Sequence, residues 1–357
     1  MHTVVGRAQH YAWGDKTAIP EMLGQPADGR PWAEWWMGTH PLAPSNLEDG
    51  SPLESVAGDL PYLLKFMAAA QPLSLQTHPD QAQAEAGFAC EEQAGIPRDS
   101  PQRIYKDRSD KPEMLCALTT FDTLCGFRPV DATLSLLHEI GAEDLAVFLQ
   151  HEKLPSTVAA LYRGELDTRS TIDACRLNDR VEAQLVTELA AAYPGDPSVV
   201  VTLLLNRVLL ERGEAVFLGP GNLHAYLRGF GVEVMANSDN VVRGGLTPKH
   251  VDVDELLAVL DYEPLVRPKV RSTEVEPGHW RYATPKTPFV TSRFDLDEGQ
   301  KRSHRAEGRE LLLWVSGPQH GECQYLADGD TVDLSGPASA FLVQETVIHD
   351  DSSTVHP

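Results

Sequence analysis

The sequence predicts a mainly β protein with an inserted helical domain. Short apolar runs separated by Gly- and Pro-containing turns fill residues 1–130. Between residues 131 and 212 the apolar residues instead recur at three- and four-residue spacing, which is typical of amphipathic helices. From about residue 265 to the end, short β segments return between turns, a pattern that favours a β-sandwich or jelly roll.

In the first part, apolar runs predict strands at residues 60–66 and 73–77, and one or two further strands within 114–127. The Ala-, Glu- and Gln-rich stretch at 80–95 predicts a helix. These elements would carry most of the polar residues considered below.

In the helical part, Asp196 is followed by Pro197, which is a typical helix start. The sequence therefore predicts a helix over 198–210 that ends before Gly213. Beyond it, two short apolar runs, 215–218 and 223–227, flank a Gly-Pro-Gly-Asn turn and predict a β-hairpin.

Later strands are expected where apolar residues cluster between turns. The expected segments are 232–235, 311–315 and 341–343. The last two belong to the C-terminal β part.

Composition excludes several classes of protein. The net charge of −22 disfavours binding to nucleic acid or anionic membranes. The N-terminal residues show no basic and apolar segments of a secretory signal, so a cytoplasmic location is expected. The five scattered cysteines do not indicate a disulfide framework or a thiolate zinc site, and any metal would need His, Glu, Asp or Gln ligands.

Four residues form a candidate metal-binding set. Gln76 and His78 are two positions apart, so on a strand their side chains would share one face. Glu113 and His224 could complete a mixed nitrogen and oxygen set suited to zinc, with Mn, Fe or Co as alternatives. The same spacing also fits an exposed strand with two polar residues, and spacing alone does not separate the two interpretations.

Six motifs in order along the chain resemble the type I mannose-6-phosphate isomerases. They are YAWG at 11–14, AEWWMGTHPLAPS at 33–45, LPYLLKFMAAAQPLSLQTHPD at 60–80, DKPEM at 110–114, GNLHAYLRG at 221–229 and ANSDNVVRGGLTPKHVD at 236–252. The resemblance implies a zinc-dependent aldose–ketose isomerase that interconverts mannose 6-phosphate and fructose 6-phosphate through a cis-enediol or enediolate.

The resemblance also implies a fold of cupin-like jelly rolls with a helical domain inserted in the first. Combined with the sequence pattern, it divides the chain into three parts. These are a metal-binding catalytic domain of residues 1–130 plus 213–264, a helical insertion at 131–212, and a C-terminal β domain at 265–357.

In this family's arrangement one zinc per chain is held by Gln76, His78, Glu113 and His224. A substrate cleft would include Lys111 and Arg243. Lys65 and Ser74 match family positions on the phosphate side of the pocket. Two departures, Asp110 where the family usually has His and Gln81 where it often has Lys, remove positive charge near an anionic substrate.

Isomerisation moves hydrogen between C1 and C2, so positive charge is needed where an oxyanion develops. Arg243 is suited to that task, and Lys249 could add to the same field. Lys111 could act as the base if burial favours its neutral form, or as a fixed cation if Asp110 pairs with it. Asp239 is a second candidate for proton transfer, as is a zinc-bound water, and Asp239 could equally cap the turn in NSDN.

Two other functions stay open at this point. One is a different metal-dependent cupin enzyme, such as a dioxygenase, and the other is a sugar-phosphate-binding protein without turnover. The expected partner is a small sugar phosphate, without nucleic acid or membrane, and the oligomeric state is left open, a monomer included. The histidines of the last part, His279, His304, His320 and His349, form no ligand-like pairs in the sequence.

Overall fold

The computed structural model describes residues 1–346, and the chain forms two compact units. Unit 1 comprises residues 1–67, 232–237 and those from 270 onward, and unit 2 comprises 68–231 and 238–269. The chain passes between the units within two strands, β5 (Tyr62–Ala69) and β11 (His224–Ala236). The three-part division expected from the sequence stays a prediction, because two compact units do not establish which segments fold on their own.

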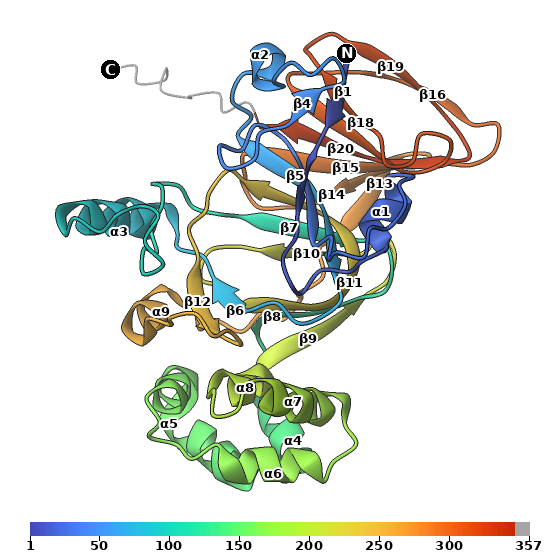
Figure 1. The fold of residues 1–357 in the computed structure, drawn as a ribbon. Helices are drawn as coiled ribbons and strands as arrows, with labels where there is room; N and C mark the ends of the chain where they lie inside the picture. Colours follow the sequence, from blue (N-terminus) through green and yellow to red (C-terminus); the bar gives the residue numbers. More distant parts are fainter. Residues whose placement is uncertain (347–357) are drawn as a thin grey trace, which may run out of the picture. The chain divides into compact units, whose positions relative to one another are not determined.

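Unit 1 is built on β structure (Figure 1). Its strands are β1 (His2–Val5), β2 (Arg7–Gln9), β3 (Glu34–Met37), β4 (Asn46–Leu47), β13 (Ser272–Glu276), β14 (His279–Tyr282), β15 (Phe289–Leu296), β16 (Lys301–Arg305), β17 (Glu310–Ser316), β18 (Cys323–Leu326), β19 (Thr331–Ser335) and β20 (Ala338–Glu345). Its helices are α1 (Ala18–Met22) and α2 (Glu54–Ala57).

Eight of these strands form one sheet in the order β13-β14-β15-β20-β17-β18-β1-β4. Strands β16 and β19 form a separate antiparallel pair. The apolar runs at 311–315 and 341–343 lie in β17 and β20, as predicted, and Phe341 and Leu313 stand opposite each other in the register. Their side chains are fully buried, as expected for apolar runs in a sheet.

Unit 2 combines short strands with helices. Its remaining strands are β6 (Leu75–Thr77), β7 (Glu113–Ala117), β8 (Phe121–Phe127), β9 (Leu205–Leu210), β10 (Ala215–Leu218) and β12 (Val242–Gly245). Its helices are α3 (Gln81–Gln93), α4 (Val130–Ile140), α5 (Glu143–Tyr162), α6 (Arg169–Arg176), α7 (Val181–Ala192), α8 (Ser198–Val201), the 3₁₀ helix η1 (Thr202–Leu204) and α9 (Val253–Val259). The helix expected at 80–95 is α3, which Asp80 starts with a capping box.

Helices α4 to α8 gather together beyond β9 (Figure 1). Their inward residues, such as Leu137 and Val186, are fully buried in one apolar core. Helix α5 is interrupted at Lys153, where φ is 64°, two positions before Pro155. Among residues 1–346, no helix combines the length and apolar character needed to cross a membrane. The mainly β fold with a helical region that the sequence predicts is confirmed.

Two local predictions are wrong. The helix expected over 198–210 ends at Leu204, and residues 205–210 form β9, which pairs antiparallel with β8. The segment is rich in Val and Leu, which suit a strand once a partner is present. The expected hairpin is also absent, because β10 pairs with β7 and β11 pairs with β8 and β6.

Candidate metal centre

Three buried side chains from separate segments of unit 2 converge. His78 follows β6, Glu113 begins β7, and His224 begins β11. Glu113 Oε2 lies 3.3 Å from His78 Nε2 and 3.6 Å from His224 Nε2. All three are at most 2% exposed, and among the described residues theirs is the group of His, Cys, Asp and Glu able to offer ligand atoms within 4.8 Å of one another.

Gln76 lies beside this group. In the sheet it stands opposite His224 of β11 on one side and Arg243 of β12 on the other. Its side-chain amide is 3.4 Å from His224 Nε2. The structure thus brings together all four residues of the ligand set expected from the sequence.

The two histidines present the same ring nitrogen to the centre. His78 Nδ1 lies 2.8 Å from the main-chain oxygen of Asn240, and His224 Nδ1 lies 2.9 Å from that of Asn222. A carbonyl oxygen only accepts hydrogen bonds, so each Nδ1 carries the proton when the ring is neutral. Each Nε2 then directs a lone pair into the centre, which is the tautomer that a metal ligand needs.

Gly221 helps to fix this arrangement. Its φ is 73°, and a Cβ there would lie 2.6 Å from the main-chain nitrogen of Asp261. Its amide donates to the main-chain oxygen of His78 at 2.8 Å. The tight turn before His224 therefore also holds the backbone of His78.

The hydrogen bonding of two atoms in the centre is consistent with a bound cation. His78 Nε2 and Glu113 Oε2 are buried and have no hydrogen-bond partner among residues 1–346. A buried acceptor without a partner is costly, and a metal ion would satisfy both atoms at once. Two imidazoles, a carboxylate and an amide oxygen match the ligands that zinc accepts.

The protonation states also suit a metal. Burial on its own would raise the pKa of Glu113, but His78, Lys111 and His224 lower that pKa well below its usual range. Burial, together with the charge of His78, lowers the pKa of His224 to about 4. Near neutral pH the centre therefore offers a carboxylate and a neutral imidazole, the forms that bind zinc.

Lys111 and Asp110 do not pair as the sequence suggested. Lys111 Nζ lies 3.3 Å from Glu113 Oε1, and the described residues include no ion pair between Lys111 and Asp110. Residues two apart in an extended segment share a face, whereas neighbours point apart. Burial, and then the charge of Asp80, raises the pKa of Asp110, whose main-chain nitrogen donates to Gln81.

Arg243 brings a half-buried cation to the strand next to Gln76. No hydrogen bond or ion pair engages its guanidinium within residues 1–346, and burial lowers its pKa from the usual value. Asp239 lies at the start of the same segment, where its main-chain nitrogen donates to Asp107 at 2.9 Å. Arg243 is thus a cation on the strand beside Gln76 for which the part of the chain that the structure describes supplies no carboxylate partner.

The other expected substrate residues are dispersed. Ser74 is half-buried just before β6, and Lys249 is exposed beyond β12. Lys65 belongs to unit 1, where its side chain is 7% exposed and its ammonium lies 2.7 Å from Glu233 and 3.8 Å from Glu34. Lys65 is therefore already paired with carboxylates of its own unit.

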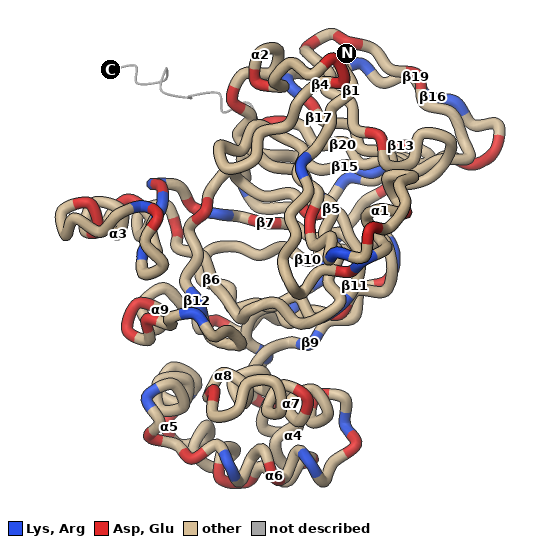
Figure 2. Tube along the Cα trace, viewed as in Figure 1, with Lys and Arg blue, Asp and Glu red and all other residues tan. Residues whose placement is uncertain are grey.

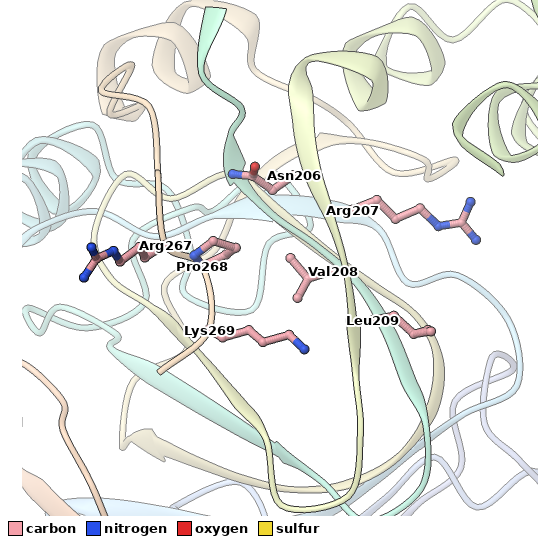
Figure 3. A pocket seen from close by; sticks show the side chains of 7 residues that line it. All are labelled: Asn206, Arg207, Val208, Leu209, Arg267, Pro268 and Lys269. Carbon is pink, nitrogen blue, oxygen red and sulfur yellow. The ribbon is translucent and has the colours of Figure 1, made fainter. Parts of the chain in front are cut away.

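A surface hollow of about 510 Å³ lies elsewhere in unit 2 (Figure 3). Its lining includes Arg207 and Lys269, but Arg207 is bound to Asp122 and Lys269 to Glu214. A third cation of the lining, Arg267, has no ion pair among the described residues, but the lining contains none of the expected metal ligands.

Within the described residues, the C-terminal histidines do not belong to a group of side chains that could bind a metal ion. His304 Nε2 pairs with Glu310 at 2.6 Å, and His279 packs against Phe294. His320 bonds to the main-chain oxygen of Gly317, and His349 lies outside the described residues.

Sequence reasoning missed the two asparagines that orient the histidines. Asn222 and Asn240 act through main-chain oxygens, which any residue possesses, so residue type alone does not reveal them. The available signal was their place in the GNLH and NSDN segments, beside the expected ligands.

Comparison with known proteins identifies close relatives of the chain. Residues 1–130 match the family described as phosphomannose isomerase type I, catalytic domain. The chain is 38% identical over 374 residues to a mannose-6-phosphate isomerase of Salmonella typhimurium, covering 96% of this chain and 94% of that protein. It is 32% identical over 373 residues to mannose-6-phosphate isomerase 1 of Arabidopsis thaliana, covering 91% and 83%.

Solved structures show the same similarity. A crystal structure described as mannose 6-phosphate isomerase from Salmonella typhimurium bound to substrate and to a zinc atom has a TM-score of 0.84 to this chain. The sequence identity is 32%, and the alignment covers 97% of this chain and 100% of that one. A zinc-bound holo form of mannose 6-phosphate isomerase matches with the same TM-score, identity and coverage of this chain.

Proposed function

The chain belongs to the type I phosphomannose isomerase family, and from this premise we propose that it is a zinc-dependent isomerase of mannose 6-phosphate and fructose 6-phosphate. The observation that carries the proposal is the pair of buried, partnerless ligand atoms on His78 and Glu113, with the unpaired Arg243 on the neighbouring strand. The partnerless ligand atoms favour binding of a metal cation, and the charge of Arg243 suits an anionic substrate or intermediate.

The ligand set proposed for zinc is Gln76, His78, Glu113 and His224. Bound there, zinc would supply Lewis-acid charge that polarises the sugar oxygens at C1 and C2. The partnerless atoms and the imidazole tautomers support this assignment.

The reaction transfers a proton from C2 of the aldose to C1 of the ketose through a cis-enediol or enediolate. Negative charge grows on the sugar oxygens as the C2 proton leaves. We assign Arg243 to that charge, because no carboxylate of the described residues pairs with its guanidinium. Arg243 is also half-buried, where an electrostatic contact is stronger than in water.

Lys111 is proposed as a fixed cation near the reacting oxygens, with Glu113 in place of Asp110 as its partner. An ion-paired lysine is a poor base and a good electrostatic partner for an oxyanion. Asp239 is the proposed proton carrier, since its segment leads directly into β12 and Arg243.

For the phosphate group we propose Ser74 and Lys249, which carry no competing carboxylate contact in the described part of the chain. For Lys65 the proposal rests on the family resemblance alone, because its ammonium already faces Glu233 and Glu34. The wider setting we propose is a cytoplasmic enzyme acting on a small molecule, without a nucleic-acid or membrane partner. Figure 2 shows acidic residues spread over the elements of both units, in keeping with the net charge of −22.

The test is a coupled assay with mannose 6-phosphate on protein stripped of metal and then reloaded with zinc. We expect activity to follow zinc content, with one zinc per chain at saturation. Oxygen consumption with iron, and no isomerisation with zinc, would favour a cupin oxygenase. Tight sugar-phosphate binding without turnover would favour a binding protein.

A further inference from the structure

A buried asparagine lies behind the metal centre at the meeting point of three segments. Asn240 is 0% exposed, and its main-chain oxygen accepts the Nδ1 hydrogen of His78 at 2.8 Å. Its side chain, by contrast, points to a different segment, the loop of residues 106–109. The residue thus joins a metal ligand to a loop that is distant in sequence.

The side chain of Asn240 uses both ends of its amide on that loop. Oδ1 accepts from the main-chain nitrogens of Lys106 at 2.7 Å and Asp107 at 3.2 Å. Nδ2 donates to the main-chain oxygens of Asp107 at 3.0 Å and Ser109 at 2.9 Å, and to Asp107 Oδ1 at 3.2 Å. A buried amide with every donor and acceptor used is held rigidly and is costly to disturb.

Asp107 and Ser238 complete the link. Ser238 Oγ donates to Asp107 Oδ1 at 2.9 Å, and the main-chain nitrogen of Asp239 donates to Asp107 Oδ2 at 2.9 Å. We call Asp107, Ser238 and Asn240 the Asn240 clamp. It fastens the loop that leads into Lys111 and Glu113 to the segment that leads into Arg243.

We infer that Asn240 is a positioning residue for the metal centre. Through the clamp, the loop of 106–109 fixes where the main-chain oxygen of Asn240 stands, and that oxygen fixes the ring of His78. The orientation of one ligand, His78, is thereby tied to the segment that delivers another, Glu113. This inference rests on the proposed function, since it concerns the zinc site of that function.

The experiment uses the full chain as wild type and as Asn240→Ala. Zinc affinity is measured on metal-free protein by competition with a chelator of known affinity. Ligand geometry is read from the visible absorption bands of Co²⁺ in the same site. Because the partners behind a metal ligand are typically worth about 10–100-fold in metal affinity, we expect zinc binding weaker by that factor and displaced Co²⁺ bands.

The matched control is Asn206→Ala. Asn206 Nδ2 also donates to main-chain oxygens of unit 2, those of Cys125, Gly126, Phe127 and Leu265 at 3.0–3.3 Å, but no bond links it to His78. We expect this variant to lose thermal stability and keep the zinc affinity and Co²⁺ bands of the wild type. If Asn240 had only a structural role, Asn240→Ala would also lose thermal stability and keep the zinc affinity and Co²⁺ bands of the wild type.

Wild-type zinc affinity and Co²⁺ bands in Asn240→Ala would overturn the inference. If that variant does not fold, Ser238→Ala replaces it, because it removes the hydroxyl contact to Asp107 and leaves Asn240 in place. Here we expect zinc affinity to fall a few-fold, and an unchanged affinity would again overturn the inference. A wild-type protein that binds no zinc would contradict the proposed function itself, a result distinct from equal affinities in wild type and variant.

Discussion

Each unit buries a cluster of charged side chains, and the two clusters differ in how completely they are satisfied. In unit 1, Lys65 faces Glu233 and Glu34, and Glu34 also accepts a hydrogen bond from Trp36 Nε1 at 2.5 Å. We call this the Lys65 cluster. Its cation lies beside both carboxylates, so each charged group has an oppositely charged partner inside the protein.

In unit 2, His78, Glu113 and His224 leave two buried atoms without a hydrogen-bond partner, even with Lys111 beside Glu113. Buried charged groups that find partners within the protein serve the fold, whereas two buried acceptors without a hydrogen-bond partner favour binding of a cation from solution. The contrast teaches that burial of charge does not by itself mark a functional centre. The better indicator of such a centre is a buried polar atom that has no hydrogen-bond partner among the described residues.

The strongest test of this contrast is His78→Ala. Removing a ligand should cost at least as much zinc affinity as removing a residue behind it, so we expect a loss of at least about 100-fold. Isomerase activity should fall together with the metal content, measured by elemental analysis of the purified protein. His304→Ala is the control, because His304 already has Glu310 as its partner and should keep full zinc content. Full metal content in His78→Ala would refute the ligand assignment.

The Lys65 cluster is tested by Lys65→Met. It would leave two buried carboxylates without their cation, and we expect the free energy of unfolding to fall by about 3–5 kcal/mol, measured by denaturant titration. Lys269→Met is the control, since the Lys269–Glu214 pair is exposed and such pairs are worth at most about 1 kcal/mol. Wild-type stability with a raised KM would instead make Lys65 a substrate residue and remove the contrast between the clusters.

Arg243→Ala tests whether the unpaired cation of unit 2 acts on the transition state. We expect kcat and kcat/KM to fall by similar factors, about 10²–10³, as for loss of one preorganised donor to an oxyanion. Arg243→Lys, which keeps the charge and loses the fork of donors, should recover part of that loss. A raised KM with unchanged kcat would mean that Arg243 binds substrate and intermediate equally.

The smallest expected effect belongs to Lys249→Ala. An exposed cation interacts weakly with a phosphate in water, so we expect KM to rise about twofold to fivefold, with kcat affected less. The difference from wild type should shrink as salt is added to the steady-state assay. A KM that matches the wild type at low salt would exclude Lys249 from the phosphate side.

Much of the fold could be predicted from hydrophobic periodicity. Buried residues such as Phe341 and Leu137 belong to apolar patterns whose spacing matches the strand or helix in which they lie. What failed was long-range pairing. Residues 205–210 are strand because β8 lies beside them, with Leu210 opposite Phe121. The local sequence does not indicate pairing with a strand so far away along the chain. The hairpin prediction failed for the same reason.

Some features of the candidate site could also be predicted from the sequence, and others could not. Gln76, His78, Glu113 and His224 were found from residue type and family motifs, and the structure brings them together. The ion pair of Lys111 was assigned to the wrong neighbour, although the two-residue alternation of extended chain favours Glu113. Residue type did not reveal the contacts of Asn222 and Asn240 to the two histidines, since these contacts use main-chain oxygens.

The separation of the ligands along the chain has a consequence for biosynthesis. Gln76 and His224 are 148 positions apart, with the helices α4 to α8 between them. At about 5–20 residues per second, the ribosome would add His224 roughly 7–30 s after Gln76. Throughout that interval the nascent chain would hold at most three of the four ligands, so tight zinc capture is expected only after the helical segment has been made. Zinc would then join segments on both sides of the helical segment late in the assembly of unit 2.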